Sequence, residues 1–476
     1  MVTRSRLPRR DADYSRRLNS AILPLYRRKP VLNSPTADSP ETHSSETGSP
    51  TVIVAKDSVH HDKSLFASLK VADYFYLWIG MLASAFAMNM QLVAQGWLVY
   101  EMTSSAMNLT YVTLAFMLPQ VVFSPIGGVL ADRVKKKPVI GWSPLANGVA
   151  TLAMAYVVMS GNVTFEDFIL VGLFNGTVMA LSLPARTAFI PEIVGERLMF
   201  NAMAFNTAAW NLSRILGPAL AGFMIAVFAD GDTTSVYGVG LVYIVLSVLY
   251  LISAVTVLLI RHKGEPIKGH RKTPMHDLAE GMHYVFHSPI VGGLILLSIF
   301  PFLFGLSINT FLPAFSRDVL SGGPDDLGFL MTSMGVGAIG GSLLLAKLSG
   351  IGNKGNWVLV TNALWGVGVA SFALTTEFSF AFITIGIVGF ISAINMSMNR
   401  SLVQLQVEQS MRGRIMSIDL MSHGLMPLGV VPIGYIVDHV SIQAGLVTSG
   451  IMLFLVTVIS GFFMPKIRAI NTGYKI

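Results

Sequence analysis

Arg214 and Asp419 are the two formally charged residues inside the long apolar stretches of this sequence, and His423 lies four residues after Asp419. A charged side chain at the bilayer centre costs about 2.5–3.5 kcal/mol by insertion scales, so each should point into protein or a water-filled cavity. A carboxylate shielded from bulk water and an imidazole can both exchange protons. We predict Asp419 and His423 as proton carriers, and Arg214 as a group that attracts an anion or pairs with a carboxylate.

Each of these three side chains also has a simpler explanation. Arg214 could be structural and bind backbone carbonyls next to the following Gly-Pro pair, an explanation to which we give equal weight. A lone histidine is more often a packing residue, although its spacing from Asp419 places the two on one helix face. Asp419 could instead pair with basic residues at the membrane surface.

The elements that must position these residues are predicted to be transmembrane helices. The 476 residues are 53% hydrophobic and only 12% charged, whereas soluble domains contain about 25% charged residues. Apolar stretches of about 20 residues are long enough to cross a bilayer, and lipid offers the backbone no hydrogen-bond partner, so we expect helices. The sequence predicts twelve, at 76–99, 109–131, 138–159, 168–185, 202–226, 237–260, 289–313, 327–346, 356–374, 379–399, 415–437 and 443–464.

An internal repeat divides these helices into two halves. An offset of about 212 residues aligns LGPALAG at 216–222 with LGVVPIG at 428–434, and it places Thr207 over Asp419 and Asn211 over His423. Such duplication is common in secondary transporters, which bind substrate between the halves. We therefore predict two pseudo-symmetric six-helix bundles with flanking segments: a disordered tail 1–63, a bundle 64–260, a basic linker 261–287, a bundle 288–466 and a tail 467–476.

The positive charges predict the orientation of the chain. Almost all of the 33 Lys and Arg residues fall on one side of the predicted helices, and the opposite side holds only Arg317. The positive-inside rule then places both termini in the cytoplasm. Because membrane anchoring explains the net charge of +7, we expect no nucleic-acid partner. The chain has no cysteine, which excludes disulfides, thiol nucleophiles and cysteine metal sites.

Several motifs resemble those of a known family. The stretch GGVLADRVKKKPVI at 127–140 resembles the signature loop of the major facilitator superfamily, with Gly128, Asp132 and Arg133 in place but Lys135 where a glycine is usual. The stretches WLVYEMTSSA (97–106), LPARTAFIPEIV (183–194), NLSRILGPALAG (211–222) and RGRIMS (412–417) resemble the branch that includes bacterial enterobactin exporters and related efflux proteins. Gly217, Pro218 and Gly222 resemble the helix-bend motif that marks exporters in the fifth helix.

The resemblance implies a gating latch. Asp132 would accept hydrogen bonds from the positively polarised N-terminus of the eleventh helix, close to Arg412 and Arg414, and would hold the cytoplasmic side shut. The alternative is that Asp132 only offsets repulsion among basic residues that bind anionic lipid headgroups. We favour the latch for Asp132 and lipid anchoring for the lysines that follow.

Polar residues inside the predicted helices are candidates for a substrate cavity. In this superfamily the corresponding helices line the cavity, so their amides could bind substrate together with Arg214. Amides also join helices, at about 1 kcal/mol each, and both roles remain open. The candidates are Asn89, Gln91, Gln95, Asn175, Asn211, Asn309, Asn395 and Asn399.

No motif indicates an enzyme. The sequence lacks HExxH, GxSxG and Walker motifs, and GVGAIG at 335–340 lies inside an apolar stretch with no preceding strand, which favours helix packing over dinucleotide binding. We expect no cofactor and no metal. The sequence predicts a monomeric secondary transporter of the inner membrane, which works by alternating access in contact with lipid and exports small amphipathic molecules, drug-like compounds or siderophores, against inward proton flow. The alternatives are an importer or facilitator of the same fold, and a non-transporting sensor or scaffold.

Overall fold

Apolar sequence stretches become long helices throughout the part of the chain that the structure describes. The computed structural model describes residues 66–228, 236–265, 274–347, 352–408 and 411–470, and these residues contain helices and no strand. The first half contains η1 (Ser68–Lys70), α1 (Ala72–Thr103), α2 (Ala106–Arg133), α3 (Lys136–Met159), α4 (Phe165–Phe228) and α5 (Val236–Leu259). The predicted tail 1–63 lies outside the described residues.

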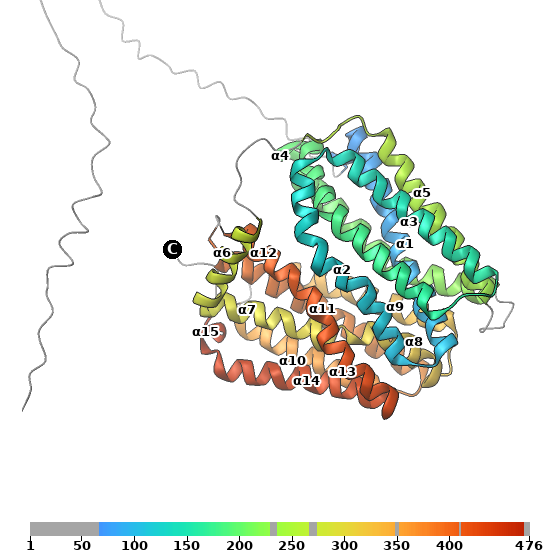
Figure 1. Ribbon diagram of the computed structural model, residues 1–476. Helices are drawn as coiled ribbons and strands as arrows, with labels where there is room; N and C mark the ends of the chain where they lie inside the picture. Colours follow the sequence, from blue (N-terminus) through green and yellow to red (C-terminus); the bar gives the residue numbers. More distant parts are fainter. Residues whose placement is uncertain (1–65, 229–235, 266–273, 348–351, 409–410, 471–476) are drawn as a thin grey trace, which may run out of the picture. The chain divides into compact units, whose positions relative to one another are not determined.

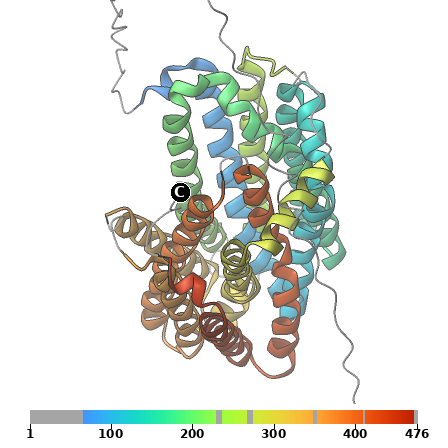
Figure 2. The ribbon, with the colours of Figure 1, turned by 90° about the vertical axis from the view of Figure 1, so that its left-hand side faces the viewer.

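The second half repeats this helical organisation with more interruptions. It contains α6 (Pro274–His287), α7 (Pro289–Phe300), the π-helix η2 (Pro301–Gly305), α8 (Ser307–Asp318), α9 (Pro324–Lys347), α10 (Lys354–Ala373), α11 (Phe378–Gln406), α12 (Arg412–Met421), η3 (Ser422–Leu425), α13 (Met426–His439), α14 (Ile442–Phe463) and α15 (Pro465–Arg468). The predicted linker 261–287 therefore includes a helix, α6. Figures 1 and 2 show the first half in blue to green and the second in yellow to red, as two groups of helices.

Ten segments of the described chain are long and apolar enough to cross a membrane. The helix α4 supplies two of them, and α7, η2 and α8 together supply one. The all-helical membrane fold is thus confirmed, whereas the number twelve remains a prediction. The two remaining predicted positions are occupied by α10 and by the segment α12–η3–α13, which the 3₁₀ turn of η3 divides.

The long helix α4 reverses direction at one glycine. Gly195 has φ 68° and ψ 171°, the one non-helical conformation inside α4, and residues with a Cβ atom rarely adopt a positive φ. Gly195 lies near the end of the membrane segment Phe165–Met199, and the next segment, Asn201–Phe228, begins six residues after it. By contrast, α4 keeps helical dihedral angles through Gly217 and Pro218, so the predicted bend motif does not interrupt the helix.

Small residues allow the helices of each half to pack closely. A Cβ atom built at Gly127 of α2 would lie 2.2 Å from the carbonyl oxygen of Ala180 on α4, and one at Gly337 of α9 would lie 1.9 Å from that of Gly386 on α11. Close backbone approach at small residues is a common means of helix association in membranes. It also explains the glycine pattern at 335–340, which serves helix packing.

The two halves contact each other mainly through α4 and α9, and through α2 and α13. Gly222 of α4 lies against the carbonyl oxygen of Pro324 on α9, and Thr332 of α9 donates a hydrogen bond to the Ile215 carbonyl oxygen, at 3.0 Å. The exporter-like motif of the sequence therefore serves the junction between the halves.

The two ends of the helix bundle carry different charges. We call the end at which α1 ends and α2 begins the acidic end, because it carries Glu101, Glu166, Asp167, Asp318, Asp325, Asp326 and Asp438 with Arg317. We call the opposite end, where α2 ends and α12 begins, the basic end.

Candidate functional site

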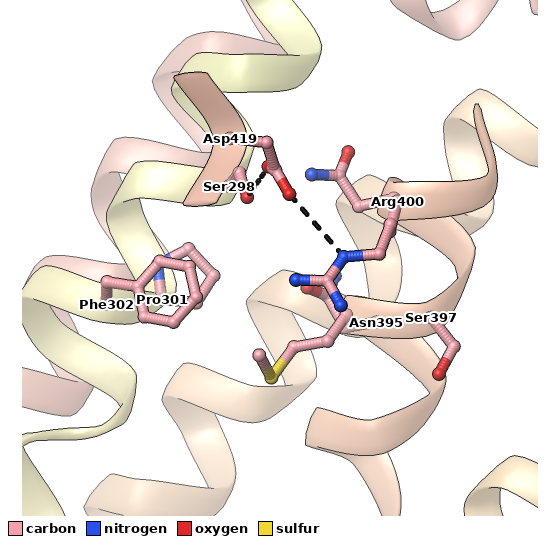
Figure 3. Close-up of a pocket in the computed structure, with 9 residues that line it drawn as sticks. Ser298, Pro301, Phe302, Asn395, Ser397, Arg400 and Asp419 are labelled. Carbon is pink, nitrogen blue, oxygen red and sulfur yellow. Dashed lines mark hydrogen bonds and ion pairs between the residues drawn. The ribbon is translucent and has the colours of Figure 1, made fainter. Parts of the chain in front are cut away.

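Asp419 lies in a small cavity of the second half, between α7, α11 and α12. The Ser298 hydroxyl donates a hydrogen bond of 2.6 Å to Oδ1 of Asp419, and Nε of Arg400 lies 3.5 Å from Oδ2. Figure 3 shows the carboxylate between these two partners. The Asp419 side chain is 3% exposed and that of Arg400 is 47% exposed. A nearly buried charge is thus paired with one that reaches the surface.

The cavity has a volume of about 110 Å³, which is enough for a few water molecules. Its lining combines charged, amide, hydroxyl and apolar side chains from three helices and η2. The lining residues are Ser298, Pro301, Phe302, Asn395, Met396, Ser397, Asn399, Arg400 and Asp419. A cavity of this size, with charged and amide groups in a partly apolar wall beside a buried carboxylate, is suited to water and proton exchange.

Irregular backbone opens the helix beside Asp419. Pro301 begins the π-helix η2, and Leu306 N–H donates to the Pro301 carbonyl oxygen at 2.9 Å. Proline has no N–H and disturbs the helix that contains it, and short π-helical turns occur frequently at functional sites. The wall of the cavity formed by Pro301 and Phe302 therefore comes from a widened helical turn.

Two predicted cavity amides lie at the Asp419 cavity. Asn395 donates hydrogen bonds of 3.0 Å to the Val358 carbonyl oxygen and to Oγ1 of Thr361. Asn399 donates to the Leu294 carbonyl oxygen at 3.1 Å, while its buried Oδ1 has no partner among the described residues. Both amides join helices of the second half, and Asn399 keeps one acceptor for water or a ligand.

Arg400 was not predicted as a site residue. The sequence placed the end of the tenth predicted helix at residue 399, whereas α11 continues to Gln406. Arg400 was therefore assigned to a surface loop, one residue outside the apolar stretch. Its position directly after Asn399 on an extended helix is the signal that could have found it.

The helix α4 carries Thr207, Asn211 and Arg214, and it belongs to the first half, whereas Asp419 lies in the second. Ile215 of α4 packs against Gly335 of α9, and Gly217 packs against Asn89 of α1. At 100° per residue, Arg214 falls between these two packed faces. Its side chain is exposed and has no hydrogen bond or ion pair within the described residues. Arg214 therefore faces the region between the halves without binding a carboxylate.

The remaining predicted amides lie outside the lining of the Asp419 cavity. Asn89 donates to the Ala85 carbonyl oxygen of its own helix at 2.8 Å, and Gln91 donates to Oε1 of Gln95 at 3.5 Å. The oxygen atoms of Asn175 and Asn309 are buried without a partner among the described residues. None of these five amides lines the Asp419 cavity.

Of the predicted gating latch, the structure describes Arg412 and Arg414 near the start of α12, and the contact of Asp132 with that segment stays a prediction. The side chains of Asp132 and His423 lie outside the described residues. At the start of α12, Nε of Arg412 donates to the Val407 carbonyl oxygen at 3.2 Å, and Arg414 forms an ion pair of 2.8 Å with Glu280 of α6. These contacts of the two arginines stay within α6 and the second half.

Two of the three lysines after Asp132 bind groups of the protein, whereas Lys135 is exposed. Lys136 is 0% exposed and forms an ion pair of 2.7 Å with Glu192 of α4, while its Nζ also donates to the Glu265 carbonyl oxygen at 2.8 Å. Nζ of Lys137 donates to the carbonyl oxygens of Leu258 and Ile260. The prediction of lipid anchoring is wrong for Lys136, because its buried ammonium is held by Glu192 and the Glu265 carbonyl. The cation of Lys137 is attracted by the carbonyl groups at the end of α5.

Charged and polar side chains connect the two halves at the acidic end. The Tyr100 hydroxyl of α1 donates to Oδ2 of Asp318 on α8 at 2.5 Å. Glu101 forms an ion pair of 3.0 Å with Arg317. Arg317, the one cation predicted on that side, therefore binds across the junction.

Comparison with known proteins identifies relatives of this chain. A sequence profile described as transmembrane secretion effector matches residues 63–473. Among curated proteins, the enterobactin exporter EntS of Shigella boydii serotype 18 is 24% identical over 290 residues, which cover 61% of this chain and 67% of the exporter.

Solved structures share the fold at low sequence identity. A bacterial homologue of the human lysosomal transporter Spinster, in an inward-facing and occupied conformation, has a TM-score of 0.67 at 12% identity and covers 85% of this chain and 97% of its own. The nucleoside transporter NupG has a TM-score of 0.63 at 17% identity, with coverage of 85% and 100%.

Proposed function

The chain belongs to the transmembrane secretion effector family of major facilitator transporters, and from this premise we propose that it is a proton-coupled exporter working by alternating access. The observation that carries the proposal is the buried Asp419 carboxylate, held by Ser298 and the half-exposed Arg400 beside a small cavity. Buried ionisable residues in membrane segments commonly mark proton pathways.

We propose that Asp419 couples proton flow to the conformational change by exchanging Arg400 for a proton. A proton that reaches Asp419 neutralises the carboxylate and removes its attraction for Arg400. Arg400 can then turn toward water, since nearly half of its side chain is already exposed. Loss of the proton re-forms the pair. Each bound proton thus changes the net charge of the pair that joins α11 to α12. Because this pair breaks and re-forms, the two helices shift relative to the first half.

The substrate is proposed to be a small amphipathic molecule, a siderophore or a drug-like compound. The named relative is an enterobactin exporter, and Arg214 offers a cation to an anionic group of such a substrate. Exposed and unpaired within the described residues, Arg214 sits between the faces of α4 that pack on α1 and α9. The neighbouring amides Asn89 and Asn211 extend this polar surface.

We place the chain in the inner membrane as a monomer, with the basic end and both termini in the cytoplasm. The distribution of Lys and Arg supports this orientation. Under it, the contacts of Tyr100 and Glu101 close the external side. In an alternating-access cycle, closure of the external side corresponds to the state in which an exporter collects its substrate from the cytoplasm.

The Asp419→Asn substitution tests the proton coupling. We expect export from loaded cells of a host that lacks its own efflux pumps to fall about tenfold and to lose its sensitivity to a protonophore, because an amide cannot carry the proton. The matched control is Asp167→Asn, which changes a partly exposed carboxylate that binds Thr164 within the first half. Export by Asp419→Asn that stays equally dependent on the proton gradient would remove this residue from the pathway. Net uptake instead of export would favour an importer.

A further inference from the structure

Asp438 binds the N-terminus of a helix in the opposite half. This carboxylate near the end of α13 accepts hydrogen bonds from the Ser105 hydroxyl at 2.7 Å, from Ala106 N–H at 2.7 Å and from Met107 N–H at 3.2 Å. These N–H groups belong to the first turn of α2, where helical N–H groups have no partner within their own helix. Asp438 therefore caps α2 across the junction between the halves.

The position of Asp438 is unfavourable for its own helix. A negative charge near a helix C-terminus is repelled by the carbonyl end, whereas one at an N-terminus is stabilised. Asp438 is the penultimate residue of α13, so its favourable helix-end interaction is with α2. The residue is thus explained by contact between the halves and not by the stability of α13.

The same short motif stands at the C-terminal ends of α2 and α13. Gly434 and Asp438 have the spacing of Gly128 and Asp132, and each aspartate is the penultimate residue of its helix. The two motifs lie at opposite ends of the bundle, because α2 runs from the acidic to the basic end and α13 runs back. Each motif is therefore placed to meet the first turn of the other segment, α2 or α12.

The two glycines of this motif, Gly434 and Gly128, differ in how closely other helices pack against them. A Cβ atom at Gly434 would lie 2.6 Å from Oγ1 of Thr110 on α2, so α13 approaches α2 closely at the acidic end. A Cβ atom at Gly128 would meet no described atom within 4 Å. One copy of the motif is thus engaged with the opposite half, and the other has room around its glycine.

From this difference we propose that Asp438 is the external counterpart of Asp132, and that the two carboxylates cap the opposite segment in alternation. In the conformation described here, Asp438 caps α2 and the acidic end is closed. In the alternate conformation Asp438 releases α2 while Asp132 caps α12. The helix α2 spans 28 residues, about 42 Å at 1.5 Å per residue, and transmits movement between its two ends. This inference rests on the proposed alternating access.

Distance measurements at both ends test this exchange. The chain contains no cysteine, so spin labels can be attached to introduced cysteines with no native thiol to remove. One pair, Ser160→Cys with Leu374→Cys, joins the halves at the acidic end, and a second pair, Lys135→Cys with Ser401→Cys, joins them at the basic end. The four positions are exposed, and the measurement uses the full chain in lipid nanodiscs without substrate.

The Asp438→Asn substitution should shift the conformational ratio about tenfold, since a charged acceptor of N–H groups becomes a neutral one of similar size. We expect longer distances at the acidic end and shorter distances at the basic end, and the opposite shift for Asp132→Asn. The control Asp167→Asn removes a carboxylate at the same end that binds only within its own half, and it should leave both distances unchanged.

Distances in Asp438→Asn that match the unsubstituted chain and Asp167→Asn at both ends would overturn the proposal. If Asp438→Asn does not fold, Gly434→Ala gives a second measurement, because its methyl group pushes α13 away from Thr110 and should shift the distances in the same direction. The distances require no transport. A shifted balance without any export would therefore refute the proposed function and keep the latch, whereas intact export with unshifted distances would do the reverse.

Discussion

Charged side chains form contacts between the two halves at the acidic end, and contacts inside a single half toward the basic end. At the acidic end, Asp438 and the pair Arg317–Glu101 join one half to the other. At the basic end, the ion pairs of Lys136 with Glu192 and of Asp419 with Arg400 each stay within one half. A similar kind of interaction thus closes one end and, at the other, stabilises each half separately. The end at which the carboxylates cross the junction is the end that is closed.

The largest expected effect comes from Lys136→Met, which breaks a buried pair at the basic end. We expect a loss of about 3 kcal/mol in stability, since the Glu192 carboxylate and the Glu265 carbonyl lose a buried cation. The ratio of conformations should not change, because the pair lies within the first half. Thermal unfolding in detergent and the two spin-label distances measure both quantities, with Lys135→Met as the exposed neighbour. A shifted ratio would show that basic-end pairs also control opening.

The Gly222→Val substitution tests whether close helix packing closes the acidic end together with the charges. The Cβ atom would lie 2.2 Å from the Pro324 carbonyl oxygen of α9, and such overpacking costs about 2 kcal/mol. We expect the distance across the acidic end to increase and export to fall. Gly352→Val, at a glycine with no described atom within 4 Å of its Cβ position, is the matched control. An unchanged distance would assign the closure to the charged contacts alone.

The smallest expected effect is that of Arg317→Gln at the acidic end. Arg317 is 43% exposed and its partner Glu101 is 15% exposed, and exposed ion pairs contribute about 0.5 kcal/mol. The conformational ratio should therefore change about twofold, less than for Asp438→Asn, and the change should diminish in high salt. Spin-label distances at two ionic strengths measure it. An effect as large as that of Asp438→Asn would place the main latch at this pair.

The membrane fold and the family were predictable because their signals are local. Each apolar stretch had to be helical in lipid, where the backbone must satisfy its own hydrogen bonds, and the loop at Gly128 and Asp132 resembled one superfamily. The confirmed family and all-helical fold follow from these features. The helix count was less secure, since α10 and the divided segment around η3 lack a long uniform apolar stretch.

The site was only partly predictable because its pairs depend on residues distant in sequence. Asp419 and the cavity amides were visible as polar residues in apolar stretches, and their roles remain predictions. Arg400 was missed through an error of a few residues in the end of a helix. Lys136 is predicted to face lipid because nothing in its local sequence reveals that Glu192 and Glu265 lie beside it.

The sequence by itself determined which segments enter the membrane, since hydrophobicity and backbone hydrogen bonding act along a single helix. It also determined the repeat that relates the two halves. Only the tertiary structure decided which charges meet. Asp438 stands in a short motif that gives no sign of its partner, and the approach of α13 to α2 at Thr110 brings it to the first turn of α2. A hydrogen bond requires its donor within about 3 Å, and that distance is set by the packing of the two halves.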